Sequence, residues 1–102
     1  MIYVIASSEV KPECRARFIE IAQKNLPNVH AEKGCVMYQL CTDFESGFAA
    51  QQKNGENTLF FIECWENIDC LKAHLATPHM KKFVEDVKDL RISSSLKVLT
   101  EA

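Results

Sequence analysis

The side chains best suited to acid–base chemistry are one glutamate and two histidines in the second half of the chain. Glu63 lies in a strongly apolar segment, on the same face of the expected strand as Phe61 and Trp65. Burial on an apolar face disfavours a carboxylate, so the pKa of Glu63 is expected to be raised, as is common in active sites. The alternative is a structural glutamate near the sheet end that pairs with a basic residue. The indole N–H of Trp65 needs a partner if the ring is buried.

His74 and His79 lie five positions apart, in Ala-His-Leu-Ala-Thr-Pro-His-Met. Two metal ligands on one helix face need a spacing of four, and no other metal-ligand pattern accompanies them, so no metal site is expected. His79 follows Pro78 in what reads as the first turn of a helix, where the helix dipole favours a neutral imidazole. A neutral histidine beside a pocket can act as a general base near neutral pH. The alternative is that both histidines hydrogen-bond the break between two helices.

Aromatic and sulfur-containing side chains have two possible roles, as core or as the lining of a flat cavity for an aromatic ligand. They are Met37, Tyr38, Phe44, Phe60, Phe61, Met80 and Phe83. Tyr38 could hydrogen-bond such a ligand, although a structural tyrosine is the commoner case. The sequence has no Gly-rich phosphate loop, nucleophile elbow or dinucleotide fingerprint, so a bound nucleotide cofactor is not implied.

The elements that must position these side chains begin with a strand and a helix. Runs rich in Ile, Val, Phe and Tyr predict strands at residues 2–8, 35–43, 58–65 and 91–99. Lys11-Pro12-Glu13 predicts a helix start, because proline suits the first turn and Glu13 favours the helix dipole. Helical spacing of apolar residues continues to about Lys33. Pro27 is expected to kink this helix or end its regular part, and Gly34 to stop it.

The second helical region is predicted as two short helices. The first covers about residues 67–74, with Ile68 and Leu71 facing inward. Thr77 then reads as an N-cap, with Pro78 at the first helical position. The apolar stripe of this helix is expected to consist of Met80, Phe83, Val84 and Val87. The polar stretch at 45–57 predicts a long loop, in which residues 48–51 are a candidate for a short irregular strand.

This order, βαββαβ, predicts one α+β domain over residues 1–102: a ferredoxin-like two-layer sandwich with helices on one face of an antiparallel sheet. Both faces of the strands are apolar, since Phe61 and Trp65 lie on one face of the third strand and Phe60 and Ile62 on the other. The helices of one chain can cover only one face. The sequence therefore predicts a homodimer whose sheets pack face to face, unless a different partner chain covers the second face.

Charge, hydropathy and cysteine content narrow the class of protein. The 12 basic and 14 acidic residues give a net charge of -2, which argues against a nucleic-acid partner. No apolar run approaches the roughly 20 residues of a membrane span, and residues 1–6 lack the charged start of a signal peptide. The five cysteines are odd in number and contain no C-x-x-C, which is typical of reduced thiols in the cytoplasm. A reactive cysteine is the less expected alternative.

Three segments together resemble the antibiotic biosynthesis monooxygenase family. Glu32-Lys33-Gly34-Cys35 followed by Tyr38 resembles its E-x-G-x-x-x-Y segment. Phe61-Ile62-Glu63-Cys64-Trp65-Glu66 resembles its E-x-W strand end, and residues 73–80 resemble its A-H-x-x-[ST]-P-H signature. The likeness extends over the whole chain, and the long loop before the third strand is most similar to the quinol monooxygenase branch. The combination is fairly specific for the family and poorly specific for a reaction.

The resemblance implies a ferredoxin-like dimer with a pocket between sheet and helices. It also implies oxygen-dependent oxidation of a quinol or polyphenol without a bound flavin or metal, and hence no cofactor. By the same carry-over, His74 and His79 are the candidates for the catalytic base or hydrogen-bond partner. The candidates for substrate binding are Tyr38, Phe61, Glu63, Trp65, Met80 and Phe83. The implied partners are a small aromatic substrate, molecular oxygen and a second copy of the chain.

The alternatives are a non-catalytic dimeric module that binds a small aromatic molecule, a structural dimer with a filled core, and an isomerase-type relative. Haem-degrading members of the family carry an asparagine on the first strand, which residues 3–7 lack. A branch that isomerises a phosphorylated sugar would need a cationic phosphate site, and no basic cluster presents one. Cys64 and Cys70 are unusual neighbours for an oxygen-handling site, because thiols are readily oxidised.

Overall fold

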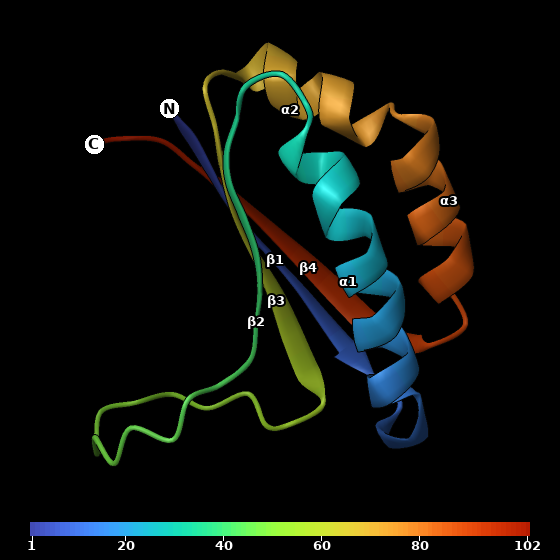
Figure 1. The fold of residues 1–102 in the computed structure, drawn as a ribbon. Helices are drawn as coiled ribbons and strands as arrows, with labels where there is room; N and C mark the ends of the chain where they lie inside the picture. Colours follow the sequence, from blue (N-terminus) through green and yellow to red (C-terminus); the bar gives the residue numbers. More distant parts are fainter.

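The chain forms a four-stranded sheet with its helices on one face, described over residues 1–102 by a computed structural model (Figure 1). The elements in chain order are β1 (Ile2–Val10), the short 3-10 helix η1 (Pro12–Cys14), α1 (Arg15–His30), β2 (Cys35–Cys41), β3 (Thr58–Trp65), α2 (Ile68–Leu75), α3 (Pro78–Val87) and β4 (Arg91–Leu99). This order confirms the predicted ferredoxin-like fold, including the division of the second helical region into two helices.

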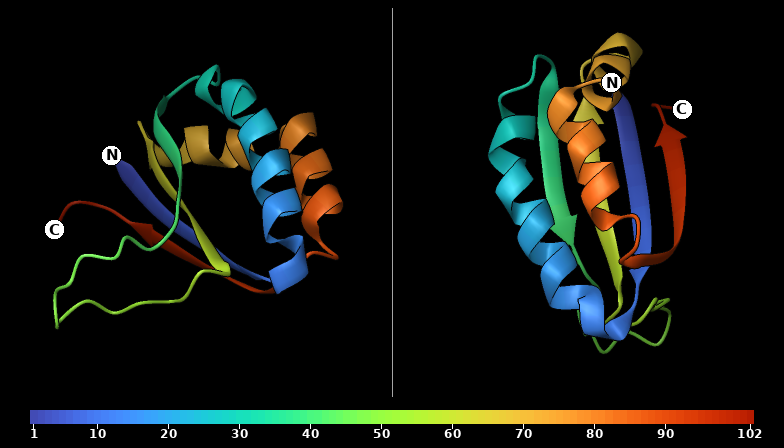
Figure 2. Two further views of the ribbon diagram at one scale, coloured as in Figure 1. Left: turned by 60° about the horizontal axis from the view of Figure 1, so that its bottom comes forward. Right: turned by 90° about the vertical axis from the view of Figure 1, so that its right-hand side faces the viewer.

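The sheet is antiparallel, with the strand order β2-β3-β1-β4. Glu63 on β3 lies opposite Val4 on β1 and Tyr38 on β2. Val4 in turn lies opposite Val98 on β4. Because side chains in register share a face, these four residues belong to the same face of the sheet. Figure 2 shows α1 and α3 side by side over this face, with α2 across one end of it.

The helix starts follow local capping rules. The Thr77 side chain accepts a hydrogen bond from the Met80 N–H at 3.3 Å, and Pro78 takes the first position of α3. At α2 the Asn67 side chain accepts from the Cys70 N–H at 3.0 Å. These caps fix the break between α2 and α3, and therefore the directions in which the histidines of both helices project.

Aromatic rings pin the helices to the sheet. Phe83 of α3 packs edge-on against Phe18 of α1, with ring centroids 6.0 Å apart, and against Phe61 of β3 at 5.7 Å. Phe18 and Phe61 also contact each other at 6.4 Å. Trp65 is fully buried at the end of β3. The core therefore forms between the helices and the strands β1, β2 and β3, while β4 contributes no residue to it and has Leu96 61% exposed.

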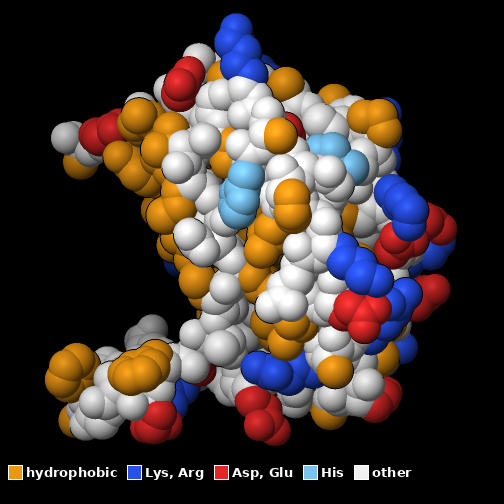
Figure 3. Space-filling view, in the orientation of Figure 1, with side chains coloured by type: hydrophobic (Ala, Val, Ile, Leu, Met, Phe, Trp, Pro, Cys, Tyr) orange, Lys and Arg blue, Asp and Glu red, His pale blue; other side chains and the backbone are white.

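The other face of the sheet has no helix over it. Phe60 and Ile62 point to this face and are only half-buried. Figure 3 shows hydrophobic side chains along the edge of the molecule that faces away from the helices, whereas most Lys, Arg, Asp and Glu lie over the helices. In the single chain, an apolar face of the sheet is thus left uncovered. This agrees with the sequence, in which the strands carry apolar residues on both faces.

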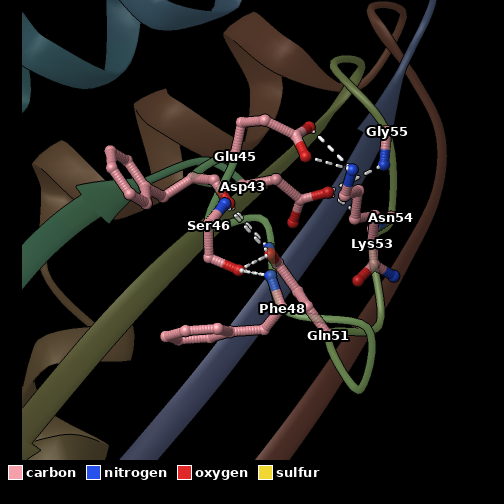
Figure 4. Close-up of polar contacts among 9 residues, drawn as sticks. Asp43, Glu45, Ser46, Phe48, Gln51, Lys53, Asn54 and Gly55 are labelled. Carbon is pink, nitrogen blue, oxygen red and sulfur yellow. Dashed lines mark hydrogen bonds and ion pairs between the residues drawn. The ribbon is translucent and has the colours of Figure 1, made fainter.

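The segment between β2 and β3, residues 42–57, projects beyond this open face as an arm (Figures 1 and 2). Its own polar side chains hold it in shape: Asp43 accepts from the backbone N–H groups of Asn54 and Gly55, and Lys53 pairs with Glu45 (Figure 4). Phe44 and Phe48 remain 79% and 74% exposed on it. In Figure 4 the Phe48 ring extends away from the polar contacts.

Several expectations about the elements were wrong. Residues 48–51 form no strand, because side-chain hydrogen bonds within the arm replace a strand partner. Pro27 lies inside α1, which stays helical to His30, so it does not end the regular part of the helix; buried Val29 anchors the turn that follows it. Gly34 lies beyond the helix, in the turn into β2. On the shorter helices, Ile68 and Val84, which were expected to face inward, are 42% and 49% exposed, and Val84 lies at the edge of a pocket.

None of the three α-helices combines the length and the apolar character needed to cross a membrane.

Gly34 supplies a direct test of the turn that carries Glu32 to its position. Gly34 and Gly47 have nearly equal positive φ values of 79° and 78°. A Cβ on Gly34 would clash with the Cys70 side chain, whereas a Cβ on Gly47 would meet nothing within 4 Å. Gly47→Ala is therefore expected to cost about 1–2 kcal/mol of unfolding free energy from backbone strain alone. Gly34→Ala should cost a further 1–3 kcal/mol or so from overpacking.

Urea unfolding of both variants at one protein concentration measures the difference. Equal losses in the two variants would show that the contact between Gly34 and Cys70 is not tight.

Candidate functional site

A pocket of about 320 Å³ lies between the helix-covered face of the sheet and the helices α2 and α3. Its walls are mostly apolar, and all four strands contribute to them. The aromatic, titratable and sulfur-containing side chains that line it are Tyr38, Phe61, Glu63, His74, Met80, Phe83 and Arg91. The pocket closes against the core at β3 and opens toward the uncovered strand β4, at Leu96. Its size and lining suit a small aromatic ring system.

Glu63 is buried in the wall of this pocket, with only 5% of its surface exposed. Its Oε1 accepts a hydrogen bond from the Trp65 indole N–H at 3.0 Å. Burial raises the pKa of Glu63 from 4.5 to about 7, although the Trp65 hydrogen bond opposes the rise, and the nearby Glu32 charge adds to it. No salt bridge involves Glu63, so the alternative of a structural ion pair is wrong. Glu63 can therefore exchange a proton near neutral pH.

His74 lies beside Glu63, and its ring is 1% exposed. The imidazole packs on Trp65, with ring centroids 4.6 Å apart, and on the edge of Tyr38 at 5.4 Å. Burial lowers the pKa of His74, while the hydrogen bond and charge of Glu32 oppose the shift. His74 is thus neutral near pH 7. Its Nδ1 lies 2.9 Å from the Glu32 Oε2, and this is the only hydrogen bond that the ring makes within the protein.

His79 faces a different part of the surface. Its Nε2 lies 3.1 Å from the same Oε2 of Glu32. The ring lines a second cavity, a polar groove of about 270 Å³ between α1 and α3, and does not line the pocket. Only Phe83 borders both cavities. Glu32 therefore joins one histidine in the pocket wall to another in the groove.

Six of the side chains predicted from the sequence line one pocket: Tyr38, Phe61, Glu63, His74, Met80 and Phe83. The other two do not reach it. Trp65 is fully buried and touches the pocket only through Glu63 and His74. His79 is separated from it by Glu32. Both rings approach the carboxylate of Glu32 and neither hydrogen-bonds the residues between α2 and α3, so the alternative that the histidines hydrogen-bond the helix break is wrong.

The two histidines and Glu32 do not resemble a metal site. One nitrogen of each ring points at the same oxygen of Glu32. In a metal site, by contrast, all three side chains would point at the ion that they share. No cluster of at least three His, Cys, Asp or Glu side chains in the chain has a geometry that could hold a metal ion.

The match to a known family model agrees with this arrangement. The model of antibiotic biosynthesis monooxygenases matches residues 1–86, which include Glu32, Glu63, His74 and His79.

The chain belongs to the antibiotic biosynthesis monooxygenase family.

A relative from Escherichia coli K12, named "Probable quinol monooxygenase YgiN", is 35% identical over 101 residues, which cover 97% of this chain and 96% of that protein.

Solved structures share the fold at lower identity. One described as an antibiotic biosynthesis monooxygenase superposes with a TM-score of 0.83 at 22% identity, over 100% of this chain and 99% of that one. A conserved protein from Methanosarcina mazei Go1 gives a TM-score of 0.86 at 20% identity, over 99% and 92% of the two chains. The family match ends before β4, so the strand at the open side of the pocket lies outside the matched range.

Sequence reasoning missed the contribution of two regions of this site. Glu32 lies in the turn after α1 and reaches both histidines, although its motif was noted only for its spacing to Tyr38. β4 supplies Leu96 and Ser94 to the pocket rim. The parity of β4 could have identified Leu96, because it lies opposite Ala6 on the helix-covered face.

Glu63→Gln tests the burial of this carboxyl group. The pKa of Glu63 is raised from 4.5 to about 7, so the folded protein binds more protons than the unfolded chain between these values. The contribution of Glu63 to the unfolding free energy therefore falls as pH rises through this window. Gln does not titrate and still accepts from Trp65. The variant should gain stability relative to the wild type between about pH 5 and about pH 8, by on the order of 1–3 kcal/mol.

Urea unfolding of both proteins across this pH range measures the effect, and the His74 contribution largely cancels in the difference. A difference that does not change with pH would contradict the assigned burial of Glu63.

Proposed function

We propose that this chain is an oxygen-dependent monooxygenase that oxidises a quinol or polyphenolic small molecule. The observation that carries the proposal is the position of His74, whose Nε2 makes no hydrogen bond within the protein, in the wall of an aromatic pocket that Glu63 also lines. Membership of the monooxygenase family and 35% identity to a protein named as a quinol monooxygenase support it.

The reaction needs little from the protein. A quinol becomes a good one-electron donor to oxygen once a hydroxyl group loses its proton. The pocket holds the ring among Tyr38, Phe61 and Phe83, limits water access and offers a proton acceptor. In our proposal the quinolate itself reduces oxygen, and no bound flavin or metal takes part.

Atoms and electrons balance for one substrate and one oxygen molecule. A quinol plus O₂ gives a hydroxylated quinone plus water: one oxygen atom enters the ring, and the other leaves as water with two hydrogens. Simple oxidation would instead give a quinone and hydrogen peroxide. His74 takes the hydroxyl proton at Nε2, and the proton returns to the reduced oxygen later in the turnover. Glu63, with a pKa of about 7, is the second group able to donate or accept a proton at the ring.

We further propose that the enzyme is a homodimer in which the open sheet face of one copy packs on that of another. The half-buried Phe60 and Ile62 support this arrangement, because an apolar sheet face of this kind is rarely left in contact with water. The exposed Phe44 and Phe48 on the arm are suited to the same partner. All five cysteines are free thiols, and we place the enzyme in the cytoplasm, where thiols stay reduced.

Oxygen uptake with naphthohydroquinone tests the reaction. The wild type should consume oxygen well above the autoxidation background, and His74→Ala should reduce this rate at least about tenfold, since a positioned general base contributes 10²–10⁴-fold. Lys72→Ala, on the exposed side of the same helix, should keep the wild-type rate. Catalase should return no oxygen if the product is water.

A wild-type rate equal to background would overturn the quinol assignment and favour a module that binds aromatic molecules without reacting. Return of half of the consumed oxygen by catalase would show simple oxidation to peroxide and contradict monooxygenation.

Light scattering coupled to size exclusion tests the dimer. The wild type should elute with twice the mass of one chain. Ile62→Glu, which adds a charge to the open face, should shift the protein toward the monomer, because burying an unpaired charge is costly. Ala73→Glu adds the same charge on exposed α2 and should leave the dimer intact. A wild-type monomer, or a dimer unaffected by Ile62→Glu, would contradict packing through this face.

A further inference from the structure

One carboxylate oxygen connects three separate elements beside the pocket. The Oε2 of Glu32, in the turn after α1, lies 2.9 Å from Nδ1 of His74 on α2 and 3.1 Å from Nε2 of His79 on α3. The side chains of Glu32 and His74 are 13% and 1% exposed, and that of His79 is 25% exposed. The contact between Glu32 and His74 is a hydrogen bond, and charge-assisted hydrogen bonds in a poorly hydrated site are strong and directional.

The contact decides which nitrogen of His74 carries the proton. A carboxylate can only accept hydrogen bonds, so the Nδ1 atom facing Glu32 must be the N–H. Nε2 is then the bare acceptor, and it makes no hydrogen bond to a protein group. In the other tautomer, a lone pair on Nδ1 would face a negative oxygen, and the pocket would lose its base. Glu32 thus selects the reactive form of His74.

Glu32 also places a negative charge beside the positive charge that His74 acquires when it takes a proton. When His74 takes a proton at Nε2, a buried imidazolium forms, and burial disfavours that cation. The adjacent negative carboxylate offsets this cost, which matches the direction in which Glu32 acts on the pKa of His74. Glu32 does not line the pocket, so it influences the reaction through His74 and has no contact with the substrate.

His79 has the geometry of a support for Glu32. Its Nε2 faces the carboxylate, and its Nδ1 is buried without a hydrogen-bond partner. Since His79 lines the groove between α1 and α3 and not the pocket, it does not contact a substrate ring bound in the pocket. What His79 offers to the site is a close contact of its Nε2 with the Glu32 Oε2, which restricts where that carboxylate can lie.

We propose that Glu32 and His79 are positioning residues: His79 holds the carboxylate of Glu32, and Glu32 holds His74 as the Nδ1–H tautomer with Nε2 free for the substrate proton. The kinetic part of this assignment rests on the proposed function, whereas the tautomer of His74 does not. Of the two histidines expected to act on the substrate, only His74 is then a catalytic residue.

Paired substitutions separate positioning from proton transfer at His79. Gln keeps an N–H donor for Glu32 but cannot titrate, whereas Ala removes the donor. His79→Gln should keep kcat for naphthohydroquinone within about twofold of the wild type, and His79→Ala should lower it by about tenfold, the effect of losing about one hydrogen bond in the transition state. KM should change little in both, because the pocket lining is intact. Equal losses in the two variants would overturn the positioning role and make His79 an acid–base group.

The same logic divides the role of Glu32 into geometry and charge. Glu32→Gln retains an acceptor for the Nδ1–H of His74 but no charge, and should lower kcat by about tenfold. Glu32→Ala removes both and should lower kcat by about a hundredfold, as expected when a catalytic group is misplaced. Lys82→Ala, on α3 one turn after His79, is the control and should match the wild type. If the Glu32 variants showed a lower kcat, a higher KM and a lower melting temperature together, the role of Glu32 would be purely structural and the proposal would be overturned.

Long-range ¹H–¹⁵N NMR of the histidine rings gives a readout that needs no substrate. The wild type and Glu32→Gln should show His74 as the Nδ1–H tautomer, and Glu32→Ala should show a mixture or the Nε2–H form. A His74 already in the Nε2–H form in the wild type would overturn the proposal, whatever the activity. The expected tautomer in a protein that consumes no oxygen would instead support the positioning role and overturn only the proposed function.

Discussion

The contact between the carboxylate of Glu32 and the ring of His74 is the interaction on which the site depends. It ties the turn after α1 to α2 across a distance of 2.9 Å, and His79 adds α3 to the same oxygen. The covered face of the sheet supplies the other half of the site through Glu63 and Tyr38, which lie opposite each other in register. A histidine whose pKa burial lowers, a carboxyl group with a pKa of about 7 and aromatic side chains therefore line one pocket.

The asymmetry of the sheet explains both the pocket and the open face. The helices cover one face, and their core forms over β3 around Phe18, Phe61 and Phe83. β4 receives no such cover, so a cavity remains between it and α3, open at Leu96. The opposite face carries apolar side chains because the strands are apolar on both sides, and these suit a second copy of the chain. The helices lie on one side of the sheet and do not cover its fourth strand. This mismatch leaves space for a ligand.

The sequence could predict whatever local rules determine. The strand face shared by Glu63, Phe61 and Trp65 follows from alternation, and the α3 start follows from the Thr77-Pro78 pair. The position of Glu32 could not be predicted, because its contact to His74 spans 42 residues and depends on how three helices pack. The direction of His79 was missed for the same reason.

Errors in the local predictions also have a tertiary cause. Pro27 is tolerated in α1 because Val29 is buried after it, and residues 48–51 lack the strand partner that their composition alone suggested. Each of these outcomes depends on contacts that no short window of sequence contains.

The central claim is that the pocket removes a proton from a bound quinol before oxygen reacts. Anaerobic mixing of the protein with naphthohydroquinone, at a pH where the free quinol is protonated, tests this claim directly through the absorbance of the quinolate. The account predicts a red-shifted quinolate band that forms on binding to the wild type and is lost in His74→Ala. A bound quinol that keeps the spectrum of the neutral form would contradict it.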